Sequence, residues 1–420
     1  MVLERKKELT KFGIIALTAV VSVKLWSFNK VSEGKLNPLE IMIVLGLIAI
    51  TIYGYNKIHK KLVFKYNVHF FLWIPFLSAF GALLYHHQSI TLSALALRMN
   101  FYWLLYFVLH IFNIPKQKII NLMIFIGAVW IFLTVAQQFT YPHYYFYSRD
   151  DSDQSIYRAG VYRYMISGHQ YGDFIIFYFF YKFLTTQKII NLAFVFMGLL
   201  GFYYYGTRQF ALSAVVCLCI AAFFAKGMYR IYMITFLCIV AAVILKYKDQ
   251  LFGQYVELTA DQLKYGDDIR LLSANFFLTE YWPSRFARLI GNGLAYASTR
   301  YGREMVNINL YLHFYRSDVG IIGAFNQFGL LYVLNIFWLN IKGLTGKYLS
   351  SESGYMRLLF LNPVLLIVLS EYYSRSTVIP FYCFVLYLAD KSLEEKNLSK
   401  GKPETQVANE TPYPDNFLYK

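Results

Sequence analysis

The chain has 420 residues, of which 57% are hydrophobic, 20% are aromatic and only 15% are charged. Soluble globular proteins carry about 25% charged residues, so this composition excludes a water-soluble globular domain. Lysine and arginine together number 40 and aspartate and glutamate 24, which gives a net charge of +16. We therefore expect an all-α, polytopic integral membrane protein, with lipid covering most of its outer surface.

Apolar runs bounded by charged or turn residues follow one another along the chain and predict about twelve transmembrane helices of roughly 20 residues each. An even number of spans places both termini on the same side of the membrane. The expected spans are 12–28, 39–56, 67–86, 92–113, 119–139, 166–185, 188–205, 209–225, 229–246, 319–341, 355–371 and 374–389.

The spans divide the chain into parts of different character. Residues 269–290 place apolar and aromatic residues with arginine at intervals typical of an amphipathic helix lying on a membrane surface. The turn Gly291-Asn292-Gly293 ends this stretch. We expect helices one to nine in 1–246 with an external loop at 140–165, a large external loop at 247–318 between helices nine and ten, helices ten to twelve in 319–389, and a polar cytoplasmic tail at 390–420.

Lysine and arginine separate to opposite sides of this topology. Most lysines, such as Lys57, Lys116, Lys118 and Lys188, fall in segments on one side, and the positive-inside rule makes that side the cytoplasm. Both termini are then cytoplasmic. Most arginines fall on the external side, where the planar guanidinium suits bidentate contact with phosphate oxygens. The alternative is that these arginines pair with loop carboxylates or contact lipid phosphates.

Ionisable side chains recur at the external ends of the predicted spans, where charged groups in a membrane protein are functional candidates. Arg208 begins an Arg-x-x-x-Leu sequence; an arginine at a helix entrance can also simply extend to the membrane interface. His313 and Arg316 are three residues apart, so a helix would put them on one face. Together these side chains predict an anion site facing away from the cytoplasm, built from Arg163, His169, Arg208, Arg270, Arg300, Arg303, His313, Arg316, Asp318, Glu371 and Arg375.

Other motifs predict no separate chemistry. The acidic sequences Asp151-Ser152-Asp153 and Gly266-Asp267-Asp268 have the form of metal–nucleotide motifs, but nucleotides are cytoplasmic and these loops are external. Gly291-Asn292-Gly293 lacks the Lys-Ser/Thr of a phosphate-binding loop. The cysteines lie inside apolar runs and form no disulfide or metal pattern: Cys217, Cys219, Cys238 and Cys383. We expect no metal, no cofactor and no nucleic-acid partner.

Three features resemble the Wzy-type O-antigen and capsular polysaccharide polymerases, whose close relatives are the O-antigen ligases. They are Arg208-x-x-x-Leu212 after an aromatic run, Arg270 followed by Leu289-Ile290-Gly291-Asn292-Gly293-Leu294, and His313 through Asp318-Val319-Gly320-Ile321-Ile322-Gly323. The resemblance is strongest over residues 160–340. Ligases typically carry His-Asn where this chain has His313-Phe314, which favours the polymerase.

The resemblance implies a metal-independent glycosyltransferase of the bacterial inner (plasma) membrane. Its substrate would be an oligosaccharide repeat unit on undecaprenyl pyrophosphate, with membrane lipid around it and a chain-length regulator left open as a protein partner. It implies catalytic roles for His313, Asp318 and Arg208, and substrate binding by Arg270, Arg300, Arg303, Arg316, Arg163, His169, Glu371 and Arg375. Which group is the general base stays open. External aromatic residues would stack on sugar rings: Tyr144, Tyr145, Tyr147, Tyr281 and Trp282.

Three alternatives to the polymerase remain. A ligase differs only in its acceptor, the lipid core. A transporter or polysaccharide flippase is expected to show repeat symmetry and ionisable groups near the bilayer midplane. Here the middle of most predicted spans is uncharged, and the large insertion lies after the ninth helix and not at a centre of symmetry. A structural membrane scaffold is the last alternative.

Overall fold

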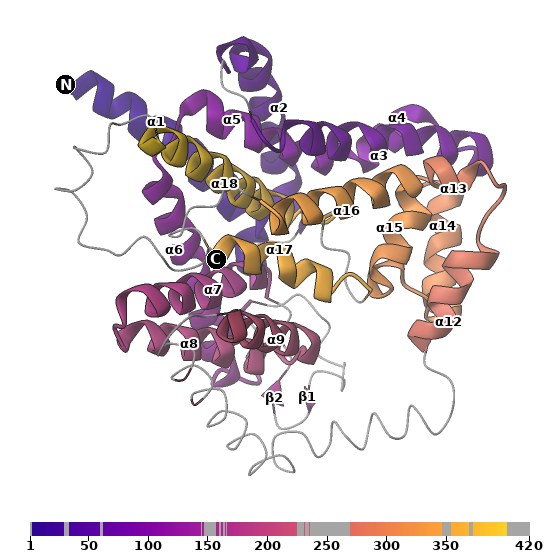
Figure 1. The fold of residues 1–420 in the computed structure, drawn as a ribbon. Helices are drawn as coiled ribbons and strands as arrows, with labels where there is room; N and C mark the ends of the chain where they lie inside the picture. The colour runs from indigo at the N-terminus through magenta and orange to yellow at the C-terminus, as the bar shows by residue number, and fades with distance from the viewer. Residues whose placement is uncertain are drawn as a thin grey trace.

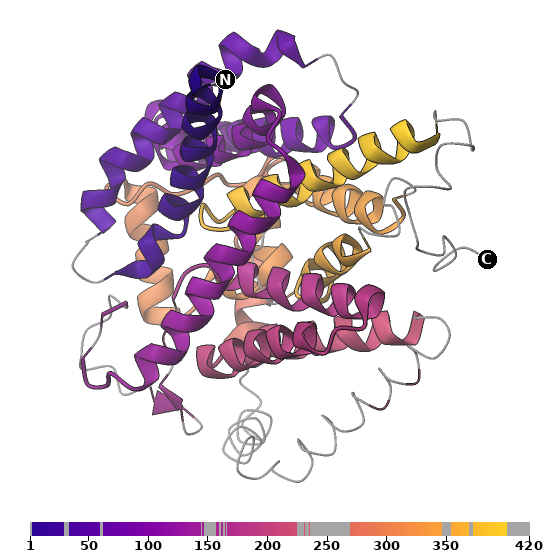
Figure 2. The same ribbon diagram turned by 90° about the vertical axis from the view of Figure 1, so that its left-hand side faces the viewer.

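A computed structural model places most of the predicted helices (Figures 1 and 2). Outside the described residues are the predicted ninth span (229–246) apart from two single positions, most of the 140–165 loop, and 247–268 of the large loop. The described residues are 2–28, 33–58, 62–143, 145–146, 157–158, 161–162, 164, 166–224, 231, 235, 269–346, 354–368 and 373–400.

The described part of the chain is all-α, as expected, apart from one short hairpin in the 140–165 loop. The hairpin pairs β1 (Tyr157–Arg158) with β2 (Val161–Tyr162) in antiparallel register. The helices are α1 (Val2–Ser22), α2 (Glu33–Gly54), α3 (Lys65–His86), α4 (Ile90–Ala96), α5 (Leu104–Phe112), α6 (Lys116–Gln138), α7 (His169–Thr186), α8 (Ile190–Tyr205), α9 (Arg208–Phe224), α12 (Ile269–Asn275), α13 (Ala287–Ile290), α14 (Arg300–Asn307), α15 (Gly320–Phe328), α16 (Leu330–Leu344), α17 (Tyr355–Leu365) and α18 (Ile379–Lys400).

Three of these helices are long and apolar enough to cross a membrane, at Leu36–Lys57, Lys65–His86 and Lys116–Gln138. A fourth span results if α4 and the following helix, Arg98–Phe112, which are bent by 52° at their junction, are counted together. The second, third and fifth expected spans are therefore found where the apolar runs predicted them. The described residues support three to four spans and not the twelve expected.

The shortfall has physical reasons in the sequence. Gly329, with φ 80° and ψ −179°, breaks the expected span 319–341 into α15 and α16. The apolar helices α8, α9, α16 and α17 have 11 to 17 residues. At a rise of 1.5 Å per residue all four are shorter than the hydrocarbon core of about 30 Å. The first turns of α1 and the last turns of α18 carry charged residues, which shortens their apolar parts.

The helix α18 forms the centre of the molecule. It packs against α1, α5, α6 and α17, and Figures 1 and 2 show it running between the N-terminal helices and the α6–α8 group. The side chains from Phe381 to Ala389 are almost completely buried. Beside it, Phe71 of α3 stacks on Trp103 at 4.6 Å and on Tyr373 at 5.5 Å between ring centroids. This aromatic core holds α3 against the C-terminal helices.

Lysine-rich segments meet at one end of the molecule. Lys118 contacts Glu8 of α1 at 3.2 Å, and Lys116 contacts Glu395 of α18 at 2.8 Å. Just inside this end, the buried carboxylate of Asp390 accepts from the backbone N–H of Val63 at 2.9 Å and from the Tyr106 hydroxyl. These contacts join the ends of α1, α5, α6 and α18, segments that the charge pattern assigns to one side of the membrane.

The turn Gly291-Asn292-Gly293 is inserted between α3 and the α15–α16 break. The N–H of Asn292 donates to the Asn326 carbonyl at 2.9 Å, and the N–H of Gly293 donates to the Gln327 carbonyl at 2.8 Å. A Cβ at Gly81 of α3 would overlap the Gly291 carbonyl oxygen, so glycine is required for this close approach. The turn therefore anchors the external loop to two helices of the bundle.

Candidate functional site

The C-terminal end of α3 forms one wall of the candidate site. His87, in the left-handed region at φ 54°, ends the helix after His86. The side chain of Gln88 then donates to the Leu294 carbonyl at 2.9 Å and accepts from the Tyr296 N–H at 2.9 Å and the Thr299 hydroxyl at 3.0 Å. These bonds fix the segment that leads into α14 against the end of α3.

A stack of aromatic rings results from this junction. Thr299 caps α14 by accepting from the Gly302 N–H at 2.9 Å, which sets the position of Tyr301 in the first turn. The Tyr301 ring lies on the imidazole of His86 with centroids 3.8 Å apart and planes 10° apart. The ring of Tyr281 lies near the same imidazole at 5.9 Å and 17°.

Arg316 lies on one side of this stack and is only 6% exposed. One terminal nitrogen, Nη2, donates to the Tyr301 hydroxyl at 2.9 Å, and that hydroxyl donates to the Gly293 carbonyl at 3.1 Å. The guanidinium carbon is 5.5 Å from the ring centroids of Phe277 and Tyr281. The Nε nitrogen is buried and has no hydrogen-bond partner among the described residues. The guanidinium is thus held in place with donor capacity to spare.

Glu304 of α14 lies beside the same rings and is partly open to solvent, with a side chain 44% exposed. Its carboxylate accepts from the Tyr281 hydroxyl at 2.7 Å and is 3.8 Å from Nδ1 of His86. Burial, followed by the Tyr301 hydroxyl and the bond to Glu304, raises the pKa of Tyr281 above its ordinary value, and burial likewise raises the pKa of Tyr301. Both phenols therefore remain protonated donors at neutral pH.

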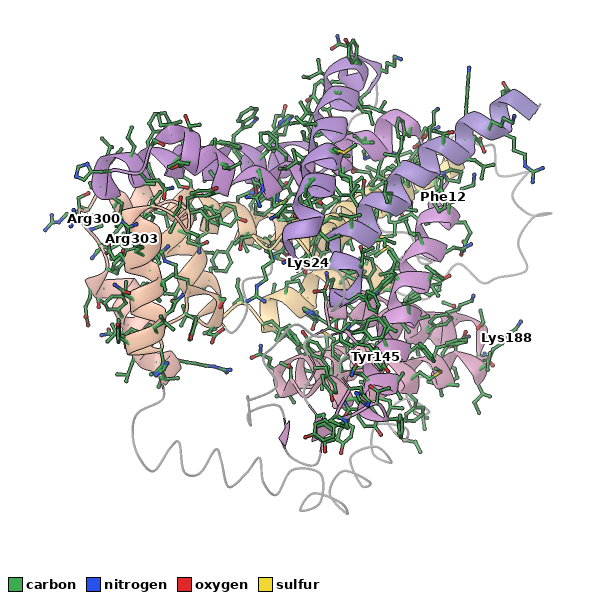
Figure 3. The ribbon with its side chains drawn as sticks, turned by 180° about the vertical axis from the view of Figure 1, so that it is seen from behind. Phe12, Lys24, Tyr145, Lys188, Arg300 and Arg303 are labelled. Atoms are coloured by element: carbon green, nitrogen blue, oxygen red, sulfur yellow. The ribbon has the colours of Figure 1, made fainter. Side chains whose placement is uncertain are left out.

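Arg300 and Arg303 project from the exposed surface of α14, at one edge of the molecule in Figure 3. Nη1 of Arg303 lies 3.5 Å from the Ser298 carbonyl. Arg270 is exposed in the first turn of α12. Together with Arg316 these arginines belong to one region, residues 269–318, built around a small core that includes Phe277, Tyr301, Met305 and Val319.

The expectation that His313 and Arg316 share a helical face is wrong. The π-helical turn Ile308–Leu312 ends at His313, whose φ of 56° is incompatible with a continuing helix. A new 3₁₀ turn, η7 (Arg316–Asp318), starts three residues later. His313 is exposed while Arg316 is buried. Asp318 is also exposed and accepts from the Ser317 hydroxyl at 3.1 Å.

A second group of predicted site residues joins this region through Arg375. Nη2 of Arg375 lies 3.5 Å from the Ser317 carbonyl in η7, and the side-chain amide of Gln170, next to His169, donates to the Thr377 carbonyl at 2.6 Å. The His169 imidazole stacks on Phe210 in the first turn of α9 at 4.3 Å. The starts of α7 and α9 therefore lie beside the turn before α18. Arg208 begins α9, with a side chain outside the description, and Arg163 and Glu371 lie outside the described residues.

The expected sugar-stacking residues occupy different environments. Tyr281 belongs to the stack at His86, and the neighbouring Trp282 packs its ring on Phe325 at 4.9 Å. Figure 3 places Tyr145 well away from Arg300 and Arg303. Tyr144 and Tyr147 lie outside the described residues.

His86, Tyr301 and Glu304 are members of the site that sequence reasoning missed. The signal that could have found His86 is the polar run His86-His87-Gln88 closing an apolar span at its external end. Nothing in the sequence pairs that run with α14, more than two hundred residues later. Among the described residues, no three His, Cys, Asp or Glu side chains lie close enough together to hold a metal ion.

The chain matches no model of a known protein family, and no curated protein matches it significantly.

Proposed function

We propose that this chain is a glycosyltransferase of the bacterial inner membrane that polymerises oligosaccharide repeat units carried on undecaprenyl pyrophosphate, on the external side. The observation that carries the proposal is Arg316, a buried guanidinium fixed by Tyr301 and aromatic rings, with Nε still free to donate. Such a group suits the pyrophosphate of the carrier, because donors in a partly dry site bind an anion more strongly than donors in water.

The reaction requires little from the protein beyond stabilising the negative charge of the leaving group. Pyrophosphate is a good leaving group, and negative charge grows on it as the glycosidic bond breaks. A preorganised guanidinium stabilises that charge without a metal, and removing one such donor typically costs about 10²–10³ in rate. Arg300, Arg303 and Arg270, exposed in the same region, add positive charge around the approach to Arg316.

The other predicted site residues keep their proposed roles. Arg375 and His169 connect the region of Arg316 to the starts of α7 and α9, so Arg208 belongs to the same neighbourhood. In this proposal Arg375 and His169 bind the lipid-linked substrate, and Arg208 keeps a catalytic role together with His313 and Asp318, which are both exposed.

The variant Arg316→Lys tests the proposal, since it keeps a positive charge and loses the planar fork. Cells carrying it should accumulate single repeat units in place of a ladder of long chains on a gel of extracted polysaccharide. The control is Lys188→Ala, at the opposite end of the molecule in Figure 3, which should leave the ladder intact. A normal ladder from Arg316→Lys at normal expression contradicts the role of the guanidinium.

Purified protein in detergent separates the polymerase from its alternatives. A polymerase should convert lipid-linked repeat units, extracted from cells that lack the chain, into longer lipid-linked polymer. A transporter would convert nothing, because detergent leaves no compartments. A ligase would lengthen nothing either, and its loss in cells would leave long chains on the carrier with none on the lipid core.

A further inference from the structure

We propose that Glu304 is the proton acceptor that activates the sugar hydroxyl attacking the lipid-linked donor. This inference rests on the proposed function and names the base that the sequence left open among His313 and nearby carboxylates. Among the described residues, Glu304 is the carboxylate that contacts the ring stack holding Arg316, through Tyr281 and His86.

The two charged groups contact the same aromatic side chain. The Glu304 carboxylate accepts from the Tyr281 hydroxyl at 2.7 Å, and the guanidinium carbon of Arg316 lies 5.5 Å from the centroid of the Tyr281 ring. Arg316 is buried, whereas the Glu304 side chain is 44% exposed. In this proposal the pyrophosphate leaves beside Arg316, and the acceptor hydroxyl reaches the donor sugar from the solvent side, at Glu304.

Two neighbouring side chains fix the position of the Glu304 carboxylate and leave some of its hydrogen-bond acceptor positions open. The Tyr281 hydroxyl donates to Oε1, and Nδ1 of His86 is 3.8 Å from Oε2. A carboxylate has about four acceptor positions, so these contacts leave room for a sugar hydroxyl. His313 has no comparable fixation, because it lies exposed at the turn between the π-helical segment and η7.

The step balances as a single displacement. The acceptor hydroxyl oxygen forms a bond to the anomeric carbon of the donor sugar, and its proton passes to Glu304. The bond between that carbon and the pyrophosphate oxygen breaks, and its electron pair leaves with the pyrophosphate, beside Arg316. The proton on Glu304 then returns to solvent, to which the carboxylate is open. No metal, oxidant or reductant takes part.

The test compares Glu304→Gln with Glu280→Gln. The amide of Glu304→Gln can still accept from Tyr281 but cannot take up a proton. Glu280 is an exposed glutamate of the same loop, which accepts from the Asn275 amide at 3.3 Å, and it serves as the matched control. Initial rates are measured on purified full-length protein in detergent, with repeat units extracted from cells that lack the chain.

We expect Glu304→Gln to lower kcat by about 100-fold or more, the usual contribution of a positioned base. Its KM for the lipid-linked repeat unit and its Kd for undecaprenyl pyrophosphate should stay at the wild-type values. Glu304→Asp should recover part of the rate, and Glu280→Gln should behave as wild type.

Two outcomes overturn the assignment. A wild-type kcat for Glu304→Gln excludes Glu304 as the proton acceptor while leaving the proposed polymerase intact. A raised Kd for undecaprenyl pyrophosphate, with kcat unchanged at saturating substrate, shows a structural role in the site and also excludes it. If wild-type protein and Glu280→Gln make no polymer in the same assay, it is the proposed function that fails, and the role of Glu304 falls with it.

Discussion

Burying the guanidinium of Arg316 costs several kcal/mol unless its charge and donors find partners. Contacts with ring faces contribute about 0.5–2 kcal/mol each when water is excluded, and here they come from Phe277, Tyr281 and Tyr301. The Tyr301 hydroxyl adds a hydrogen bond and passes it on to the Gly293 carbonyl. The Tyr301 hydroxyl thus links the buried Arg316 guanidinium to the turn at Gly293, which anchors the external loop.

We predict that Tyr301→Phe lowers the free energy of unfolding by about 1–3 kcal/mol, because Nη2 of Arg316 and the Gly293 carbonyl each lose a buried partner. The measurement is unfolding of purified protein in detergent. Tyr311→Phe, at a tyrosine that is 79% exposed, is the control and should change little. Equal stability of the two variants would show that the Tyr301 hydroxyl does not connect Arg316 to the turn.

Tyr301→Phe should also change how the stability of the protein depends on pH in the alkaline range. Burial raises the pKa of Tyr301, so above about pH 10 the unfolded chain releases this proton and the folded protein keeps it. Folded protein then binds more protons, and stability falls as pH rises. Tyr301→Phe should make that alkaline decline shallower than in wild type, as measured by unfolding of both proteins in detergent over a range of alkaline pH.

For single residues, the sequence could predict that Arg316 belongs to the candidate site, but not which side chains surround it. An arginine just before an apolar run, on the side poor in lysine, is visible from the residues alone. Its burial against Tyr281 and Tyr301 depends on how the loop folds back on α3, which no local spacing encodes. His313 was paired with Arg316 by an assumed helix, and the left-handed backbone at His313 separates them.

At the level of helices, the apolar runs predicted the positions of α2, α3 and α6 well. They predicted helix bounds wrongly where a glycine interrupts an apolar run. Gly329 adopts φ 80° and ψ −179°, a conformation essentially restricted to glycine, and so ends α15 inside an apolar stretch. The expected amphipathic helix at 269–290 is likewise divided into α12, the π-helical turn Phe276–Glu280, and α13. Hydropathy reports where a chain is apolar, and not where it turns.

The anchoring of the loop on α3 predicts opposite effects for two glycine substitutions in candidate spans. A Cβ at Gly81 would overlap the Gly291 carbonyl, and backbone shifts of this kind cost about 1–3 kcal/mol. A Cβ at Gly46 of α2 would meet no atom within 4 Å, so alanine there should stabilise the helix by about 0.5–1 kcal/mol. Unfolding in detergent measures both. Gly81→Ala as stable as Gly46→Ala would place the 291–293 turn elsewhere.

On the scale of the whole molecule, the charge pattern predicted which segments lie together better than it predicted their packing. Lys116, Lys118 and the end of α18 were assigned to one side, and they meet through Glu8 and Glu395. Arg300 and Arg303 lie at the opposite end from Lys188 in Figure 3. The central position of α18 had no signal in the sequence, because burial by other helices and burial by lipid select the same apolar residues.

Arg300 and Lys188 lie at opposite ends of the molecule in Figure 3, and this separation predicts from which side of the membrane each position can be labelled. Arg300→Cys and Lys188→Cys are placed singly in a background in which Cys217, Cys219, Cys238 and Cys383 are replaced by alanine. Both sites lie on exposed surface, so each should react with a membrane-impermeant maleimide wherever that reagent reaches it. We expect Arg300→Cys to be labelled in cells with a permeabilised outer envelope, and Lys188→Cys only in inverted vesicles. The reverse pattern would put Arg316 and Glu304 in the cytoplasm, away from any externally displayed repeat unit, and would end both proposals.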